Sequence, residues 1–395
     1  MGGGGQGSRY QGRLVQIKAT PLDVPVTLDA AGIEKNTSLS VCLVEIRADD
    51  GMTGHGFTAI TEEEVVAAAV NQVIAPALQD EDPLAHERIW ERLYWLLSPR
   101  GQTGYASHAI AAVDVALWDL KGKILGQPVW RLLGAARSKV PVYTTFGFGA
   151  YSRDELAAAA KWWAARGHKR LKMVVGHHAL QRRDEPRPPA EVIAEDVRRV
   201  RAVRDAVGAE IELQVDANCS LDSFHATRLA RSLEEFGISF FEEPVKENDI
   251  PSLLALKRET RIPLAAGQNE GLAWRFRDLM VARAVDLVQP NVVIGGGFTQ
   301  CVKIAAMASA FNVPMANGGA WAHHNMHLHG GLAHGGLVEY HYPAVKVCEA
   351  IYGPLPAPVD GWLALPETPG LGIEPKSDLV RELAKRPTSR GKGKA

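Results

Sequence analysis

The sequence has few cysteines, no long apolar run and no excess of charge of either sign. Its four cysteines are spread over 395 residues without a Cys-x-x-Cys pair, which predicts reduced thiols in a cytoplasmic protein. No uninterrupted apolar stretch approaches the roughly 18 residues that a membrane helix needs, and no apolar segment of a signal peptide follows the glycine-rich start. The 44 basic and 45 acidic residues favour neither nucleic acid nor an anionic membrane as a partner. We therefore expect a small-molecule partner.

Two patterns of secondary structure follow one another along the chain. Residues 10–60 alternate apolar and polar side chains around the turn at 49–51, which is typical of an antiparallel hairpin, and the residues up to 133 then show helical periodicity. From residue 135 to 354, short apolar strands alternate with amphipathic helices about every 30 residues. The sequence therefore predicts an α/β protein, with an α+β domain at 10–134 and a (β/α)7β barrel of the TIM type at 135–354. The eight expected barrel strands are Val140–Tyr143, Arg170–Val175, Ile211–Asp216, Ile238–Glu242, Pro263–Ala266, Asp286–Gln289, Val313–Ala316 and Leu337–Tyr340.

The two ends of the chain differ in composition from its interior. Residues 1–9 are glycine-rich and residues 385–395 form a basic tail, so both are predicted to be disordered. Segment 355–384 is predicted to return to the N-terminal domain.

Three acidic or amide residues each follow an apolar run, and they fall 26 residues apart twice: Asp216, Glu242 and Gln268. This spacing accommodates a strand, a crossover helix and two loops, so three successive parallel strands are expected to deliver one oxygen ligand each to a common point at their carboxyl ends. Oxygen ligands suit Mg²⁺. The alternative is that each residue is a helix N-cap or loop residue after its strand.

Five ordered blocks resemble the enolase superfamily, most of all its mandelate racemase and acid-sugar dehydratase branch. The blocks are Ala112–Gly122, Val215–Asn218, Phe241–Pro244, Ala266–Asn269 and Gln289–Gly296. The resemblance covers residues 14–374 and implies an N-terminal capping domain over the barrel, a bound Mg²⁺, and abstraction of the proton α to a substrate carboxylate with the metal stabilising the enediolate. It also implies a homo-oligomer and capping loops, at about 21–35 and 51–61, that close over the substrate.

The resemblance assigns the three metal ligands to Asp216, Glu242 and Gln268, although the family normally has Glu at the third position. An amide oxygen can still bind Mg²⁺, but the site loses one negative charge and should bind the ion more weakly. Glu270 is the alternative third ligand, and its use would require strand alternation to be broken at Gly267.

The second barrel strand keeps only one of the two lysines that the family uses. The family pattern Lys-x-Lys reads Lys172-Met-Val174 here, so the position of the usual base holds Val174. Strand alternation directs Lys172 into the barrel, where a divalent cation would lower its pKa as a base requires. Lys172 is therefore either the base or a cation that binds the substrate carboxylate. His177 and His178 follow this strand within reach of the site.

The family's Asp-His dyad is missing from the matching positions, which hold Asn291 and Asn317. Neither amide accepts a proton at ordinary pH, so racemisation with two bases is not expected, and both are assigned to substrate binding. Glu339 matches a family position that hydrogen-bonds the substrate carboxylate, with an ordinary strand-end salt bridge as the alternative. Tyr143 is expected to line the pocket.

Four histidines cluster in Trp321-Ala-His-His-Asn-Met-His-Leu-His329. We expect His323 and His324 in a loop at the carboxyl end of the barrel, where one of them protonates a leaving hydroxyl. His327 and His329 are expected to pack on the following helix. Zinc binding by this cluster is disfavoured because the Glu of an HExxH motif is absent.

These features predict an Mg²⁺-dependent lyase that removes water from a sugar acid. A base takes the α-proton, and an acid assists loss of the β-hydroxyl. One alternative is a cycloisomerase or epimerase that acts on a sugar acid or its lactone. Another is a family member that binds a carboxylate ligand without turning it over, because four groups used by the family are replaced, at Val174, Gln268, Asn291 and Asn317.

Overall fold

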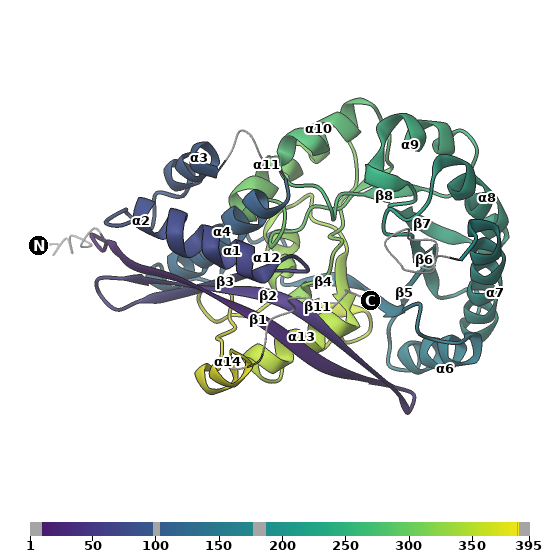
Figure 1. Cartoon of the computed structure of the whole chain (residues 1–395), viewed down its shortest axis with the longest axis horizontal. Helices are drawn as coiled ribbons and strands as arrows, with labels where there is room; N and C mark the ends of the chain where they lie inside the picture. The colour runs from purple at the N-terminus through teal and green to yellow at the C-terminus, as the bar shows by residue number, and fades with distance from the viewer. Residues whose placement is uncertain (1–9, 98–102, 177–186, 385, 387–395) are drawn as a thin grey trace, which may run out of the picture.

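The computed structural model describes residues 10–97, 103–176, 187–384 and 386. Its first part is an antiparallel sheet with helices, and its second part is a curled parallel sheet surrounded by helices (Figure 1). The ends predicted to be disordered, apart from residue 386, lie outside the described residues, as do His177 and His178. No helix in the described ranges is long and apolar enough to cross a bilayer.

The N-terminal sheet consists of β1 (Leu14–Ala30), β2 (Ile33–Ala48) and β3 (Thr53–Ala59), paired antiparallel in that order. A two-residue turn joins β1 to β2, and both of its residues have positive φ, 59° and 75°, as a tight hairpin requires. Residues 21–35, predicted as a capping loop, form the strands and turn of this hairpin instead, although Leu28 and Lys35 do line the cavity over the barrel. The predicted turn at 49–51 joins β2 to β3, which confirms the second hairpin.

The helices of the N-terminal half lie on one face of this sheet. The Ala-rich α4 packs on β3, where a Cβ added to Gly56 would stand 2.3 Å from the carbonyl oxygen of Ala112. Small residues on both elements therefore allow this close approach. The helices are α1 (Glu63–Ala69), which continues through a π-helical turn into α2 (Ala75–Ala77), then α3 (His86–Leu97), α4 (Tyr105–Ile124) and α5 (Val129–Leu132).

The parallel sheet has the strand order β10-β4-β5-β6-β7-β8-β9. Its strands are apolar and largely buried, as expected when helices cover the outer face. The strand predicted at 313–316 is reduced to two single bridges, Val288 to Met315 and Ala316 to Leu337, which link β9 to β10 and close the ring. The predicted barrel is thus confirmed with a very short seventh strand. The strands are β4 (Lys139–Gly147), β5 (Arg170–Val174), β6 (Glu212–Asp216), β7 (Ile238–Glu242), β8 (Leu264–Ala266), β9 (Leu287–Val288) and β10 (Val338–His341).

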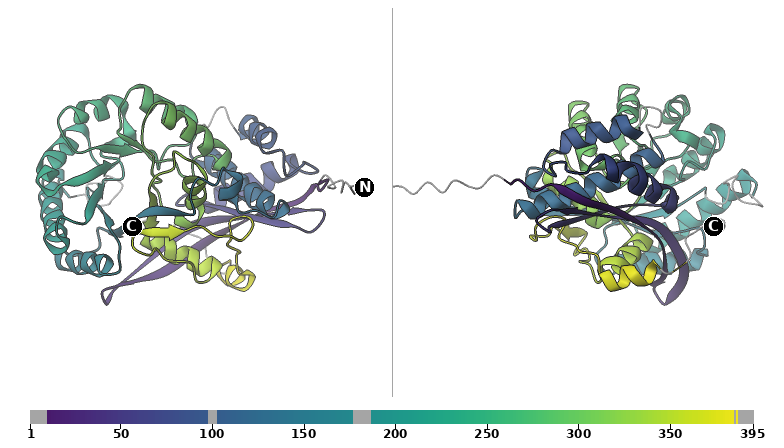
Figure 2. Two further views of the ribbon diagram at one scale, coloured as in Figure 1. Left: turned by 180° about the vertical axis from the view of Figure 1, so that it is seen from behind. Right: turned by 60° about the vertical axis from the view of Figure 1, so that its left-hand side comes forward.

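Helices surround this sheet on its outer side (Figure 2). Local signals set several of their starts: Ser152 and Glu155 form a capping box on α6, and Asp222 caps α8. The C-terminal segment contributes β11 (Trp362–Ala364), antiparallel to β4, and α14 (Ser377–Leu383). The barrel helices are α6 (Arg153–Ala164), α7 (Pro189–Val207), α8 (Ser223–Leu233), α9 (Ile250–Lys257), α10 (Ala273–Val281), α11 (Gly297–Ala310), α12 (Ala322–Gly331) and α13 (Tyr342–Tyr352).

Asp114 joins the N-terminal domain to the barrel. It lies on α4 and accepts a hydrogen bond from the backbone N of Thr299 at 3.0 Å, in the first turn of α11, so it supplies an acceptor that this helix end lacks. Burial raises the pKa of Asp114 to about 7. The contact requires Gly297, whose φ is +89° and whose added Cβ would lie 2.1 Å from an Asp114 oxygen.

Asp119, one turn and a half further along α4, holds the C-terminal segment. Its carboxylate accepts from the backbone N of Leu371 at 2.7 Å and from that of His55 at 2.8 Å, and it pairs with Lys123 at 2.7 Å. The resembling block at 112–122 therefore serves domain packing through both of its aspartates.

Candidate active site

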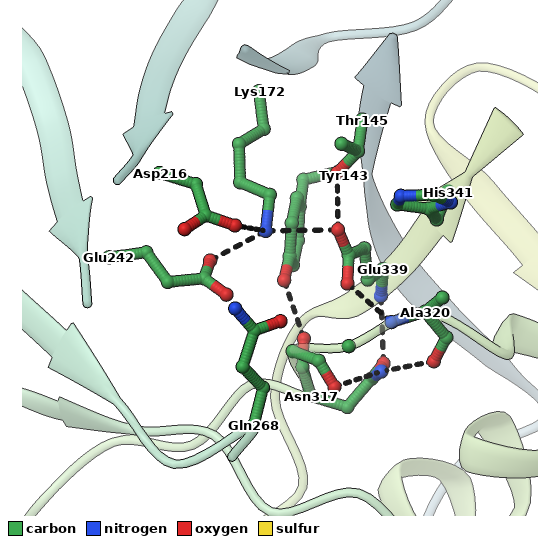
Figure 3. A network of polar contacts seen from close by, with 12 residues as sticks. Tyr143, Thr145, Lys172, Asp216, Glu242, Gln268, Asn317, Ala320, Glu339 and His341 are labelled. Carbon is green, nitrogen blue, oxygen red and sulfur yellow. Dashed lines mark hydrogen bonds and ion pairs between the residues drawn. The ribbon is translucent and has the colours of Figure 1, made fainter. Parts of the chain in front are cut away.

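Lys172 is the centre of a buried cluster of charges at the carboxyl ends of the barrel strands (Figure 3). Its Nζ lies 2.6 Å from Glu242 Oε2, 2.9 Å from Glu339 Oε1 and 3.2 Å from Asp216 Oδ2. Asp216 and Glu242 are direct partners across β6 and β7 and are the last residues of these strands. Register between parallel strands therefore brings these two predicted ligands together.

The charges in this cluster strongly affect one another. Burial raises the pKa of Asp216, and burial and the charge of Asp216 raise the pKa of Glu242 well above its usual value. Burial acts on Lys172 in the opposite direction, but the attraction of Glu242 and Glu339 outweighs it and raises the lysine pKa well above 10.5. The three carboxylates around the ammonium group therefore favour the protonated lysine, and the lowering of its pKa by a bound divalent cation stays a prediction.

Glu339 lies on β10 and is fixed by three donors. Thr145 donates to Oε1 through its hydroxyl, the backbone N of Ala320 donates to Oε2 at 2.6 Å, and Lys172 contacts Oε1. Burial alone would raise the pKa of Glu339, but the positive charge of Lys172 and the hydrogen bonds lower it overall. Glu339 is therefore an ionised carboxylate.

Gln268 follows β8 and is oriented by Glu243. Its Nε2 donates to Glu243 Oε2 at 2.8 Å, so the amide oxygen is the end left for another partner. Asn248 and Asn269 also donate to Glu243, whose pKa is raised to about 7 by burial and by the charge of Asp216. Glu243 thus fixes the orientation of the third predicted ligand.

The space beside Gly318 tests whether these residues suit a metal ion. An added Cβ there would lie 2.8 Å from Glu242 Oε1 and 3.1 Å from both Gln268 Cβ and Gln289 Nε2. Glu242 Oε1 and the Gln289 amide are buried and have no hydrogen-bond partner among the residues that the structure describes. The Glu242 carboxylate and the side chains of Gln268 and Gln289 therefore border a space that glycine keeps open, and with Asp216 beside Glu242 these oxygen donors fit a hard divalent cation such as Mg²⁺.

Glu270, the alternative third ligand, points elsewhere. Its oxygens accept from Asn248 at 3.0 Å and pair with Arg275 at 3.1 Å. Strand alternation does end at Gly267, whose φ is +142°, but the change of direction leaves Gln268 on the cavity and turns Glu270 towards Arg275.

A second cluster with acidic residues lies between the N-terminal domain and the C-terminal segment, where ligand atoms of His55, Asp119 and Glu374 come within 4.8 Å of one another. Lys123 contacts both carboxylates, and His55 pairs with Glu374 at 3.0 Å. The lysine already supplies a cation, so this cluster is an ion-pair network that holds the C-terminal segment to α4 and β3.

A cavity of about 690 Å³ opens above the charged cluster. Its barrel side includes Asp216, Gln268 and Glu339, and its other wall comes from the β1–β2 hairpin and the start of α4. Both halves of the chain therefore shape the space where a substrate would bind. The lining residues that bear on the argument below are Leu39, His108, Phe148, Val174, Ala320 and His341.

Three residues assigned to the pocket from the sequence do not border this cavity. Asn291 Nδ2 donates to the carbonyl oxygens of Gly318 and Gly319 at 2.7 and 3.0 Å. Asn317 accepts from the backbone N of Glu339 at 2.8 Å, and the Tyr143 hydroxyl donates to the Asn317 carbonyl oxygen at 2.5 Å. Their polar groups shape the loop beneath Glu339, so this placement gives no support to substrate contact.

The predicted loop position of His323 and His324 is wrong, because both lie in the first turn of α12. His323 Nε2 is 2.9 Å from the carbonyl oxygen of Pro356, and His324 packs edge-on against Phe57 with ring centroids 4.3 Å apart. Burial lowers the pKa of both rings. Neither borders the cavity, since the returning C-terminal segment and the N-terminal sheet cover this face of α12.

Two histidines that the sequence reasoning missed do line the cavity. His108, on α4, has Nδ1 2.5 Å from the Thr58 hydroxyl, and His341 ends β10 two residues after Glu339. Burial lowers the pKa of each to about 4, so both rings are neutral at pH 7. A signal for His341 was present, since strand alternation places residues 339 and 341 on one face.

The chain is similar to known proteins along most of its length. An arabinonate dehydratase of Saccharolobus solfataricus is 29% identical over 351 residues, 87% of this chain and 90% of that protein. A 3,6-anhydro-alpha-L-galactonate cycloisomerase of Streptomyces coelicolor is 32% identical over 334 residues, 84% of this chain and 87% of that protein. The crystal structure of L-talarate dehydratase from Polaromonas sp. JS666, complexed with Mg and L-glucarate, superposes with a TM-score of 0.81 at 29% identity, covering 94% of this chain and 97% of that one.

Family assignments cover both halves of the chain. Residues 14–134 match the family described as mandelate racemase / muconate lactonizing enzyme, N-terminal domain. Residues 154–379 match the family described as enolase C-terminal domain-like. The chain therefore belongs to the mandelate racemase and muconate lactonizing enzyme branch of the enolase superfamily.

Proposed function

We propose that this protein is an Mg²⁺-dependent dehydratase of a sugar acid. The observation that carries the proposal is the convergence of Asp216, Glu242 and Glu339 on Lys172 beneath a cavity that both domains line. Relatives named as acid-sugar dehydratases support the reaction class. The net reaction breaks the bond from Cα to hydrogen and the bond from Cβ to oxygen, releases water, and leaves a 2-keto acid after tautomerisation.

Asp216, Glu242 and Gln268 would hold the Mg²⁺. The three carboxylates around Lys172 and the one ammonium group leave a charge of −2 when all are ionised, which one divalent cation balances. When bound, Mg²⁺ supplies positive charge that stabilises an enediolate. The neutral Gln268 keeps the balance at zero, whereas a third carboxylate ligand would leave one negative charge in excess.

Glu339 and Lys172 have complementary parts in this proposal. An ionised Glu339 only accepts hydrogen bonds, so it suits a hydroxyl of the substrate better than the substrate carboxylate. Lys172 has no surface on the cavity and is held by three carboxylates. These surroundings favour its role as a cation over its role as a base.

The α-proton then needs an acceptor. Two groups of the chain are candidates for this role, and separate variants test them. His108 lines the cavity and its neutral ring has a lone pair for a proton, but the burial that lowers its pKa to about 4 makes it a weak base. Lys172 would first have to release its own proton against the pull of Glu242 and Glu339. If His108 is the acceptor, a His108→Gln variant loses exchange of the α-proton with D₂O, whereas this exchange persists in Lys172→Met when Mg²⁺ is saturating.

Cycloisomerisation is the second candidate reaction. Relatives named as cycloisomerases match the chain at 32% identity and above, and the missing two-base dyad does not prevent it. Proton abstraction is common to both reactions, and they differ in whether hydroxide or a ring oxygen leaves. The geometry of the charged cluster suits both.

One screen tests the proposal. Mono- and diacid sugars and their lactones are incubated with the protein and Mg²⁺, with an EDTA-treated sample as control, and 2-keto acids are measured as semicarbazones. Dehydratase activity gives a 2-keto-3-deoxy acid that EDTA abolishes, whereas cycloisomerase activity changes the ring form without loss of water. Thermal stabilisation by an acid, with neither product nor exchange of the α-proton in D₂O, would overturn both and favour the binding-only alternative.

Two further predictions accompany this function. We propose a homo-oligomer, which light scattering measures, and a cytoplasmic location. The screen described above also identifies which sugar acid is the substrate.

A further inference from the structure

His341 is a cavity residue whose chemistry the proposed function leaves unused. We propose that His341 donates a hydrogen bond from Nε2 to an oxygen of the bound acid, an inference that rests on the proposed function. Its position, its tautomer and the packing of its ring each support this role.

The tautomer follows from the start of α13. His341 is the N-cap residue of this helix, and its Nδ1 accepts a hydrogen bond from the backbone N of Ala344 at 3.3 Å. A nitrogen that accepts from an N–H group carries a lone pair and no proton. The proton of the neutral ring is therefore on Nε2, and Nε2 is a donor.

The ring must be neutral for this arrangement to hold. A charged imidazolium has hydrogen on both nitrogens and cannot accept from Ala344. Burial and the positive charge of Lys172 lower the pKa of His341 to about 4, although Glu339 acts in the opposite direction. At neutral pH the helix keeps its cap and the site keeps an uncharged donor.

The position of His341 directs this donor towards the substrate. Glu339 and His341 lie on the same face of β10, and Figure 3 shows the imidazole beside the Glu339 carboxylate. The ring meets Phe148 edge-on with centroids 5.2 Å apart, and both residues line the cavity. Because Ala344 occupies Nδ1, the ring nitrogen left for the cavity is Nε2.

This arrangement places a neutral donor beside the charged cluster, whose carboxylates cannot supply one. Asp216, Glu242 and Glu339 can only accept hydrogen bonds when ionised, and Lys172 is held beneath them. A sugar acid presents a carboxylate and hydroxyl oxygens that require donors. A neutral donor aimed at such an oxygen stabilises charge that develops there during the reaction.

Two variants separate the hydrogen bond to substrate from the helix cap. His341→Asn keeps an acceptor where Nδ1 stands and removes the donor, whereas His341→Gln keeps a donor where Nε2 stands and removes the acceptor. Both are assayed with Mg²⁺ and the acid that the wild type turns over best, by steady-state kinetics and thermal unfolding.

The proposal predicts that His341→Asn unfolds near the wild-type Tm and loses about 100-fold in kcat, the effect of removing one donor to developing charge. It also predicts that His341→Gln has a lower Tm and keeps more activity than His341→Asn. Wild-type activity in His341→Asn, or greater activity in His341→Asn than in His341→Gln, would show that the residue only caps α13 and would overturn the inference alone. A wild type inactive towards every acid overturns the proposed function and this inference together, so the two failures are distinguishable.

Discussion

Replacing Lys172 by Met tests the charged cluster most directly. The substitution keeps the length of the side chain and removes a positive charge that lies within 3.2 Å of three carboxylates. Removing one partner of a buried ion pair destabilises a protein by about 3–5 kcal/mol, because the remaining charge loses its compensation. In the variant, Glu242, whose pKa is already raised, takes up a proton. This removes one uncompensated charge and keeps the loss of unfolding free energy within this range.

The assay is urea unfolding in EDTA and in saturating Mg²⁺. In EDTA, Lys172→Met should lose about 3–5 kcal/mol of unfolding free energy. Mg²⁺ at 100 times its dissociation constant adds about 2.7 kcal/mol to any protein that binds it only when folded. At one fixed Mg²⁺ concentration the variant should gain more stability than the wild type, because the ion then meets uncompensated carboxylates.

A matched control separates burial from charge. Lys303→Met removes an exposed pair with Glu87, 2.7 Å in length, and should change stability by no more than about 1 kcal/mol. If Lys172→Met is as stable as this control in EDTA, the three carboxylates do not depend on the lysine and the description of the cluster is refuted. An equal gain from Mg²⁺ in variant and wild type would show that the ion binds elsewhere.

Three further substitutions test the surroundings of the site. Gln268→Glu restores the family carboxylate and should tighten Mg²⁺ binding in calorimetry, but it removes the donor to Glu243 and should lower stability in EDTA by about 1–3 kcal/mol. Asp114 has a folded-state pKa near 7, above its unfolded value of 3.8. Its contribution to stability is therefore present below pH 4 and is lost as pH rises through 7. Asp114→Asn should remove this pH dependence, which amounts to a few kcal/mol of unfolding free energy, on the order of 1.4 kcal/mol for each pKa unit. Gly297→Ala places a Cβ at φ +89° against Asp114 and should lower the Tm by several degrees.

Each of these has a result that contradicts it. Weaker Mg²⁺ binding by Gln268→Glu would remove residue 268 from the ligand set. A stability difference between wild type and Asp114→Asn that stays constant from pH 4 to pH 8 would show that the Asp114 carboxyl titrates normally. An unchanged Tm in Gly297→Ala would mean that α4 and α11 can move apart without loss.

Much of the fold follows from local pattern. The strands that end at Asp216 and Glu242 were predicted within one residue of their observed ends, because a short apolar run before a polar residue has little freedom in a parallel barrel. The long hairpin of β1 and β2 was missed, since Ala31-Gly32 is a weak turn signal. The seventh strand is shorter than predicted, because its backbone makes only single bridges with its neighbours.

The site was predicted less completely, and the reason is tertiary. Strand register places Asp216 beside Glu242, and this could be inferred from spacing alone. The direction in which α12 turns His323 depends on Pro356, 33 residues away in the chain, and no local pattern encodes that contact. His108 reaches the cavity only because α4 packs across the barrel, so its place became visible with the docking of the two halves.

The hairpin of β1 and β2 has a consequence for how this protein can change. Leu28, Lys35 and Leu39 form part of the cavity wall, yet they lie on β1 and β2 and not on the strands whose ends carry Asp216 and Glu242. Selection or engineering can therefore change the ligand preference through substitutions in the β1–β2 hairpin, while the reacting groups on the barrel strands keep their arrangement.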